Sequence, residues 1–343
     1  MTMHLDRLPR ARLSRWPTPL EDAPRLARRL GVARLLVKRD DLTDLVLGGN
    51  KVRKLEFLLG DALARGADTV ITTAGAQSNF LRLTAAAARR LGMASVLVVR
   101  GRPQAPSRGN LLLMRLFGAD IRYVGTEDPL APTTLAVMDE VAADVRRRGG
   151  QPYLVHLPTY SGGLAALGYV AGALELARQL SEQEVVPDTV VVAVGSGGTH
   201  AGLLLGLHLA QMRPRILGVS VNLPASDLRR LITAHLRDAA ALLGVSSLPA
   251  EQEIAMTDNH IGPGYGIPTP ESLDAVRLAA DAEGLLLDPI YTGKAWAALT
   301  AAVRRGEIGR DATVVFIHTG GAPNVFLHGD ALAGPAPSLL GAT

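Results

Sequence analysis

The sequence predicts an α/β protein of two domains, each a mostly parallel sheet flanked by helices, with a ligand site in the cleft between them. Three observations support this prediction. The chain has 343 residues, a length typical of about two domains. Short β-branched runs alternate with longer helical patterns, as in βαβ units. Several runs are apolar throughout, as in parallel strands that helices cover on both faces.

The elements follow in chain order. The β-branched runs predict strands at 34–38, 69–73, 95–100, 119–124, 188–195, 215–222 and 312–318. Segments rich in Ala, Leu and Arg predict helices at 51–65, 78–91, 110–117, 133–148, 163–180, 199–211, 226–243, 270–283 and 293–305. This number of strands indicates two sheets. We expect residues 1–48 and 162–343 to form a large domain and residues 49–161 a small one, with crossings at Gly48–Gly49 and near 158–163.

Composition excludes several classes of protein. The chain has no cysteine, which excludes disulfides, thiolate nucleophiles and cysteine-based metal or iron–sulfur sites. Its apolar runs are shorter than a membrane span, and the first residues lack an apolar signal region. The net charge is only +4, and the basic run at 146–148 reads as the solvated end of a helix. The histidines lack metal-binding spacing. We therefore expect a cytoplasmic protein with a small-molecule ligand and without a metal, nucleic acid or membrane partner.

Lysine is rare in this chain. Only four of the 36 basic residues are lysines, and two of them, Lys51 and Lys54, follow Gly48–Gly49 at a predicted helix start. An amine can lose its proton and form a Schiff base, which a guanidinium cannot do. The positive end of a helix also lowers the pKa of an amine placed there. A Schiff-base lysine is one interpretation, and a solvated lysine pair is the other.

Two segments run from a strand through small residues into a helix. Gly195–Thr199 would direct backbone amides at an anion, although a tight turn is the alternative. Its glycine spacing matches neither a dinucleotide fingerprint nor a P-loop, so it indicates a phosphate without a nucleotide. The second segment places Gln77, Ser78 and Asn79 at a helix start, where they could hold a carboxylate, and Ser78 could equally be a plain N-cap.

Glycine-rich segments near the C-terminus contribute aromatic and hydroxyl groups. Tyr265 and Tyr291 lie in such loops rather than in apolar helix faces. Thr319 follows a predicted core strand at its C-terminal end, where open α/β sheets bind ligands.

Six motifs in this order resemble one known family: GGNK-x-RKLEFLL, QSN, VGSGGTHAGL, PGYGIP, LDPIYTGKA and HTGGAP. They are similar to the D-cysteine desulfhydrase and 1-aminocyclopropane-1-carboxylate deaminase family, whose members are pyridoxal-phosphate enzymes of fold type II. The resemblance extends from about Arg10 to about Phe326. It implies pyridoxal 5'-phosphate as cofactor, an amino-acid substrate and a homodimer.

The resemblance also implies roles for individual residues. Lys51 would bind the cofactor covalently and act as base on the substrate Cα. Asn79 would contact the phenolic oxygen of the cofactor. Ser78 and Gln77 would hold the substrate carboxylate, with Ser78 near Cα. The phosphate would lie among Lys54, Gly195, Ser196, Gly197, Gly198 and Thr199. The substrate would also be near Tyr291 and Tyr265.

The residue after Tyr291 separates the two activities of the family. Deaminases that open a cyclopropane ring usually have a glutamate there, whereas this chain has Thr292. A carboxylate opposite the ring nitrogen makes the cofactor a stronger electron sink, and Thr292 and Thr319 offer only neutral hydrogen bonds. The resemblance thus favours α,β-elimination, with D-cysteine giving pyruvate, hydrogen sulfide and ammonia. The alternatives are the deaminase and a lyase acting on another β-substituted amino acid.

Two residues depart from the family pattern. Phe80 stands where the family usually has His or Gln, and Tyr160 stands in a segment that usually reads Gly-Gly-Ser. We expect both to line the substrate pocket and to favour a bulkier or less polar substituent. Two other classes of protein stay open, a non-catalytic cofactor carrier and a nucleotide-binding oxidoreductase.

Overall fold

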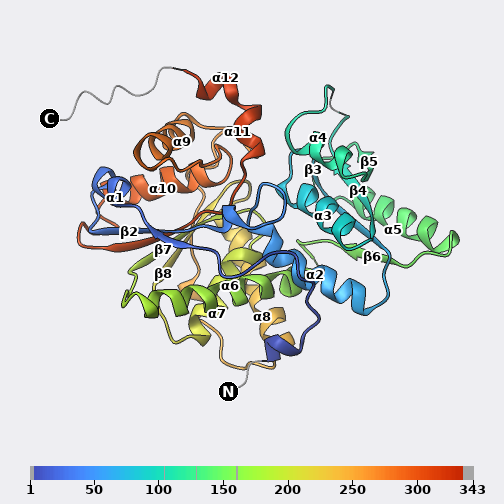
Figure 1. The fold of residues 1–343 in the computed structure, drawn as a ribbon, viewed down its shortest axis with the longest axis horizontal. Coiled ribbons are helices and arrows are strands. Elements are labelled where there is room, and N and C mark those ends of the chain that lie inside the picture. The colour runs from blue at the N-terminus through green and yellow to red at the C-terminus, as the bar shows by residue number, and fades with distance from the viewer. Residues whose placement is uncertain (1–3, 104, 129, 160, 335–343) are drawn as a thin grey trace.

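The computed structural model describes residues 4–103, 105–128, 130–159 and 161–334. It contains two sheets, set side by side with helices around them (Figure 1). The larger sheet has the order β1-β2-β10-β7-β8-β9, and every strand except β1 runs parallel to its neighbours. Its strands are β1 (Leu20–Asp22), β2 (Arg34–Lys38), β7 (Thr189–Val194), β8 (Arg215–Ser220), β9 (Ala255–Thr257) and β10 (Thr313–Ile317).

The smaller sheet is entirely parallel and has the order β5-β4-β3-β6. Its strands are β3 (Thr69–Gly75), β4 (Ala94–Arg100), β5 (Asp120–Val124) and β6 (Pro152–Val155). All four strands fall between two strands of the larger sheet in sequence, β2 and β7. The chain therefore leaves the larger sheet once and returns once, which is the topology behind the two predicted crossings. The exact domain boundaries at 48/49 and 161/162 stay a prediction.

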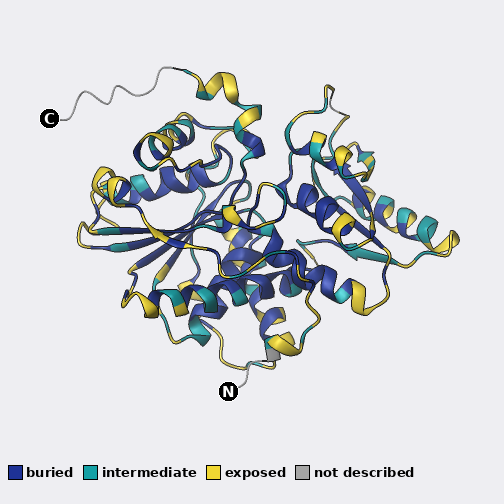
Figure 2. Cartoon of the chain, viewed as in Figure 1, coloured by how far each residue is buried: buried dark blue, intermediate teal, exposed yellow. Residues whose placement is uncertain are grey.

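Helices cover both faces of the larger sheet. One face packs on α6 (Gly162–Glu182), α7 (Gly198–Leu209) and α8 (Ala225–Leu243). The other face packs on α1 (Pro24–Leu30), α9 (Pro270–Glu283) and α10 (Thr292–Arg304). The smaller sheet has α3 (Asn79–Arg90) and α4 (Gly109–Leu116) on one side and α5 (Pro132–Arg147) on the other. Dark blue residues fill these layers in Figure 2, as both faces of a parallel sheet require.

The predicted fold class is confirmed. Each of the seven predicted strands and nine predicted helices has a counterpart that starts and ends within two residues or so of its predicted bounds. The sequence patterns missed only short elements: β1, β6 and β9, and the helices α1, α11 (Pro323–Leu327) and α12 (Gly329–Leu332). These elements have three to seven residues, which is too few to display a clear hydrophobic period.

A buried ion network fixes helix α2 (Lys51–Ala64) against the larger sheet. The Arg53 guanidinium donates two hydrogen bonds of 2.8 Å to the Asp40 carboxylate, which follows β2, and two of 2.8 and 3.0 Å to Glu175 on α6. The guanidinium also lies 4.0 Å from the centre of the Trp16 ring. Arg53 and Asp40 are both about 1% exposed. Because removal of one partner would strand the other charges in the interior, this network is a strong constraint on α2.

A second buried carboxylate of α2 binds the N-terminal segment. Glu56 accepts hydrogen bonds from the backbone N–H of Leu13 and Ser14 and from the Trp16 indole, and it forms an ion pair with Arg10. The segment thereby lies along α2 and closes that side of the molecule.

Replacing Arg53 tests the network. We expect Arg53→Met to lower the free energy of unfolding by about 3–5 kcal/mol, because Asp40 and Glu175 would keep buried charges without their main partner. Arg65→Met is the control on the end of the same helix: its ion pair with Asp61 is exposed, so the change should be about 0.5 kcal/mol or less. Urea titration followed by circular dichroism measures both. Equal effects of the two substitutions would contradict the assigned role.

Candidate active site

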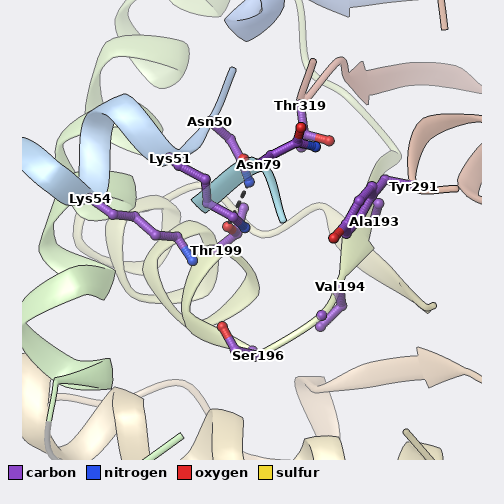
Figure 3. A pocket seen from close by; sticks show the side chains of 12 residues that line it. Asn50, Lys51, Lys54, Asn79, Ala193, Val194, Ser196, Thr199, Tyr291 and Thr319 are labelled. Carbon is purple, nitrogen blue, oxygen red and sulfur yellow. Dashed lines mark hydrogen bonds between the residues drawn. The ribbon is translucent and has the colours of Figure 1, made fainter. Parts of the chain in front are cut away.

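A pocket lies between elements of the two sheets. Its walls come from the start of α2, the start of α3, the loop from β7 into α7, the residue before α10 and the loop after β10 (Figure 3). It encloses about 370 Å³, including space open to solvent. The lining residues are Asn50, Lys51, Lys54, Asn79, Ala193, Val194, Gly195, Ser196, Gly197, Thr199, Tyr291 and Thr319. Segments far apart in the sequence therefore meet here, as the motif analysis predicted for most of them.

A strained turn places Lys51 at the first position of α2. Four successive residues, 46–49, have φ angles between +32° and +125°. At Gly48 a side chain is impossible, because a Cβ would lie 1.7 Å from the Asp41 carbonyl oxygen. The buried guanidinium of Arg82 on α3 donates to the carbonyls of Val46 and Gly48 and holds the turn from the other side. The turn thus fixes both the origin and the direction of α2.

Lys51 and Lys54 bring positive charge to the pocket without a neutralising acid. No carboxylate is among the described residues that line it. Burial lowers the pKa of Lys51 to about 8, and burial together with the charge of Lys51 lowers the pKa of Lys54 well below its usual value. Figure 3 shows both side chains extending from α2 towards the glycine loop. Such a pocket attracts an anion and holds an amine that readily becomes neutral.

The loop from β7 to α7 has the form of a phosphate cradle. Gly197 has a φ of +82° and precedes the first turn of α7. A Cβ on Gly198 would come within 3.2 Å of the Lys54 Nζ, so the absence of a side chain leaves room for the ammonium at the helix start. Thr199 accepts a 3.2 Å hydrogen bond from the Asn50 amide and so connects the loop to α2. Backbone amides, a hydroxyl and an ammonium are the donors that a phosphate requires.

His235 on α8 supports this loop from behind, a contact that no sequence motif indicated. Its Nε2 donates a 3.0 Å hydrogen bond to the Ser196 carbonyl. The ring occupies the space that a side chain on Gly162 would need, because a Cβ there would lie 1.9 Å from the imidazole. Burial is the main cause of the lowered pKa of His235, which favours the neutral ring.

The start of α3 supplies hydrogen-bonding side chains, as predicted. Ser78 is the N-cap, and its Oγ accepts from the backbone N–H of Phe80 at 3.1 Å and of Leu81 at 3.4 Å. Those bonds leave the hydroxyl proton available. Asn79 lines the pocket, and its Oδ1 accepts a 2.9 Å hydrogen bond from the buried Asn110 of α4. Asn110 therefore turns the NH₂ group of Asn79 towards the pocket, a second contact that the sequence did not reveal.

Two predicted substrate residues, Gln77 and Phe80, have side chains directed away from the pocket. The Gln77 side chain is turned to α4, since its Oε1 accepts from the Asn110 N–H and its Nε2 donates to the Arg108 carbonyl. The Phe80 ring is 4% exposed and packs in an apolar core of α2 and α3 residues. Gln77 precedes α3 and Phe80 is the second residue of that helix, so their side chains point in other directions than that of Asn79. A contact of either residue with the substrate stays a prediction. Tyr160 lies outside the described residues.

Tyr291 and Tyr265 form a pair at the edge of the pocket. Their hydroxyl groups are 2.5 Å apart, and the rings meet edge to face. Burial raises the pKa of both tyrosines, so both phenols keep their protons at neutral pH. Tyr291 lines the pocket, and Tyr265 reaches it through Tyr291.

Thr292 and Thr319 have different surroundings. Thr319 lines the pocket. Thr292 is fully buried, and its Oγ1 donates to the Asp288 carboxylate at 2.9 Å and accepts from the Asp288 N–H at 2.7 Å. The Thr292 hydroxyl is thus committed to Asp288 and is absent from the lining, contrary to the sequence-based expectation of direct cofactor contact. Asp288 itself lies behind Tyr291, and burial raises its pKa.

Comparison with known proteins decides the family, because the pyridoxal-phosphate dependent enzyme family matches residues 11–320. The chain belongs to this family. It is 41% identical over 331 residues to a D-cysteine desulfhydrase of Klebsiella pneumoniae, covering 95% of this chain and 98% of the relative. It is 40% identical over 328 residues to a Pyrococcus abyssi protein provisionally named a 1-aminocyclopropane-1-carboxylate deaminase, covering 96% of each. A solved structure described as an ACC deaminase homologue superposes with a TM-score of 0.85 at 38% identity, covering 96% of each chain.

The residues of the pocket fit the cofactor of the family. Lys51 is the amine that would bond to pyridoxal phosphate, and Lys54 with the Gly195–Thr199 loop would hold its phosphate. The free NH₂ of Asn79 would meet the phenolic oxygen. When bound, pyridoxal phosphate withdraws electrons from the substrate Cα.

The described residues contain no helix that is long and apolar enough to cross a membrane. They also contain no group of three or more His, Asp or Glu side chains placed to hold a metal ion.

The lowered pKa of Lys51 predicts how the apoenzyme takes up its cofactor. The neutral amine is the reactive form, and a pKa of about 8 makes about one lysine in ten neutral at pH 7, against about three in ten thousand for an ordinary lysine. The rate of covalent attachment, followed by visible absorption, should rise with pH and level off above about pH 8. After borohydride reduction, mass spectrometry should find the adduct on Lys51, and Lys51→Ala should have none. An adduct on Lys54 in the wild type would show that Lys54, and not Lys51, binds the cofactor covalently.

The cradle predicts a specific effect of a side chain on Gly198. Gly198→Val would push the Lys54 ammonium away from the helix start, and we expect the affinity for pyridoxal phosphate to fall about 10- to 100-fold, as for the loss of a hydrogen bond to a charged group. Gly125→Val is the control, since a Cβ there meets nothing within 4 Å. Equilibrium dialysis of the two variants measures the affinity. Unchanged affinity in Gly198→Val would indicate that the loop is a tight turn and does not bind the phosphate.

Proposed function

We propose that this enzyme catalyses α,β-elimination on a small β-substituted amino acid, with D-cysteine, which would give pyruvate, hydrogen sulfide and ammonia, as the leading substrate. The observation that carries the proposal is the neutral lining of the pocket beyond the two lysines. No carboxylate lines it among the described residues, and the hydroxyl groups present are those of Ser196, Thr199, Tyr291 and Thr319. A neutral environment keeps the cofactor a moderate electron sink, which is sufficient when a good leaving group departs from Cβ.

Each catalytic side chain has one task. The neutral Lys51 Nζ removes the proton from the substrate Cα, for which its pKa of about 8 is well matched to neutral pH. The start of α3, with the Ser78 hydroxyl, binds the α-carboxylate. The Tyr291 phenol, held by Tyr265, donates its proton to the departing sulfur. The Nζ of Lys54 and the amides of the glycine loop fix the phosphate, so that Lys51 and Tyr291 keep their positions relative to the substrate.

The second candidate is 1-aminocyclopropane-1-carboxylate deaminase. It has the support of the Pyrococcus relative and of the solved homologue, each at about 40% identity or slightly less. Opening a cyclopropane ring demands a stronger electron sink. The nearest buried acid behind Tyr291, Asp288, is already bound by Thr292 and Asn324. We therefore rank the deaminase second.

We also propose that the enzyme is a cytoplasmic homodimer. The proposal rests on the family resemblance of the whole chain, and analytical ultracentrifugation of the purified enzyme tests the oligomeric state.

A substrate panel tests the proposed reaction. We expect pyruvate from D-cysteine and from β-chloroalanine, at a rate that Lys51→Ala lowers by a factor of about 100 to 10,000, as for loss of a general base. Keto acids are measured by coupled dehydrogenase assay with D and L enantiomers supplied separately. If 2-oxobutyrate is released from 1-aminocyclopropane-1-carboxylate faster than pyruvate from any β-substituted alanine, the deaminase is the main activity and the proposed elimination is wrong.

A further inference from the structure

An arginine that has no part in the proposed elimination lies on the same side of the smaller sheet as Tyr265. Arg100 is the last residue of β4, and in the parallel ladder it pairs with Gly75, the last residue of β3. A Cβ on Gly75 would lie 3.7 Å from Cε1 of Tyr265, so the Tyr265 ring covers that glycine. Side chains of paired residues on neighbouring strands project to the same face of a sheet. Arg100 and Tyr265 therefore share one face at the carboxyl edge of the smaller sheet.

The Arg100 guanidinium has unused hydrogen-bonding capacity. It is partly buried, and its single hydrogen bond among the described residues is from Nη1 to the Glu127 backbone carbonyl at 2.9 Å. Its Nε is buried and has no partner there. Glu127 and Asp128 are the nearest carboxylates, and neither forms an ion pair with it. A half-buried guanidinium with free donors is suited to a planar anionic group.

Arg100 also acts electrostatically on the two tyrosines. Burial raises the pKa of Tyr291 and Tyr265, and the positive charge of Arg100 opposes this effect at both hydroxyl groups. Arg100 shares a sheet face with Tyr265, and the Tyr265 hydroxyl contacts that of Tyr291, so Arg100 lies on the side of the pocket where Tyr291 stands. The start of α3 is proposed to bind the α-carboxylate of the substrate. The side of the pocket near Arg100 is therefore available to the substituent on Cβ.

We propose that Arg100 is a specificity-determining residue that binds a negatively charged β-substituent, so that an amino acid with an anionic group on Cβ binds more tightly than its neutral isostere. This inference rests on the proposed elimination. With O-phosphoserine, Lys51 takes the Cα proton, the C–H electron pair forms the Cα–Cβ double bond, and the Cβ–O bond breaks with its pair going to phosphate. Water then releases ammonia and pyruvate from the enamine, and no oxidant or reductant is needed.

Aspartate and asparagine test the proposal, because they differ only in the charge of the β-substituent and neither can eliminate it. Isothermal titration calorimetry of the holoenzyme, with D and L enantiomers, should give tighter binding of aspartate by about tenfold or more. Arg100→Gln should weaken aspartate binding about 10- to 100-fold and change asparagine binding less than threefold. Arg100→Lys should be intermediate, because it keeps the charge and loses the planar fork. Arg102→Gln, an exposed arginine in the following loop, is the control and should change neither.

The outcomes are distinguishable from those of the proposed function. Equal wild-type affinity for the two ligands, or equal weakening of both in Arg100→Gln, would overturn the role of Arg100. Turnover of neutral β-chloroalanine by the wild type and by Arg100→Gln tests the elimination separately. If neither enzyme produces pyruvate, the proposed reaction fails, while the calorimetric comparison still decides whether Arg100 selects an anion.

Discussion

The ion network of Arg53 is the constraint on which the site depends. Three basic residues lie within one turn of α2, and the structure treats them differently. The middle one, Arg53, is neutralised by Asp40 and Glu175 and directed into the larger domain. The outer two, Lys51 and Lys54, face the pocket without a carboxylate. A helix fixed by one buried cation can hold two unpaired lysines in place. Lys54 offers its charge to a phosphate, and Lys51 offers a carbonyl group an amine that readily becomes neutral.

Acids are placed one layer behind the pocket rather than in it. Asp288 caps the start of α10 and is bound by Thr292 and Asn324, and Asp40 lies behind α2 with Tyr169 and Thr18. These carboxylates organise the backbone that carries Tyr291 and Lys51, and nearby hydrogen-bond donors offset their charge. The positive charge at the surface of the pocket favours an anionic ligand, and the carboxylates behind it oppose this little because their own hydrogen-bond donors offset their charge.

Local patterns were sufficient to predict the elements and the glycine motifs, because a strand, a helix start or a left-handed turn depends on neighbours in sequence. Lys51, Lys54, Asn79, Tyr291 and the loop at 195–199 could be found in this way. The supporting residues could not. His235 acts on Ser196 across 39 positions, and Asn110 acts on Asn79 across 31. Phe80 and Thr292 each adjoin a pocket residue in sequence, but the Phe80 side chain packs in a core and the Thr292 side chain bonds to Asp288, so their contacts with a ligand stay predictions.

The insertion of the smaller sheet between β2 and β7 has a consequence for motion. The chain passes between the two halves at residues 43–50 and again between β6 and α6. Arg82 binds a carbonyl of the first passage, and Gly162 and Gly163, at the start of α6, lie against His235 and Asp238. A rotation of the smaller sheet would therefore pull on the lysine turn through one passage and on the imidazole behind the phosphate loop through the other. Opening and closing of the cleft would therefore be coupled to cofactor binding, both at Lys51 and at the phosphate loop.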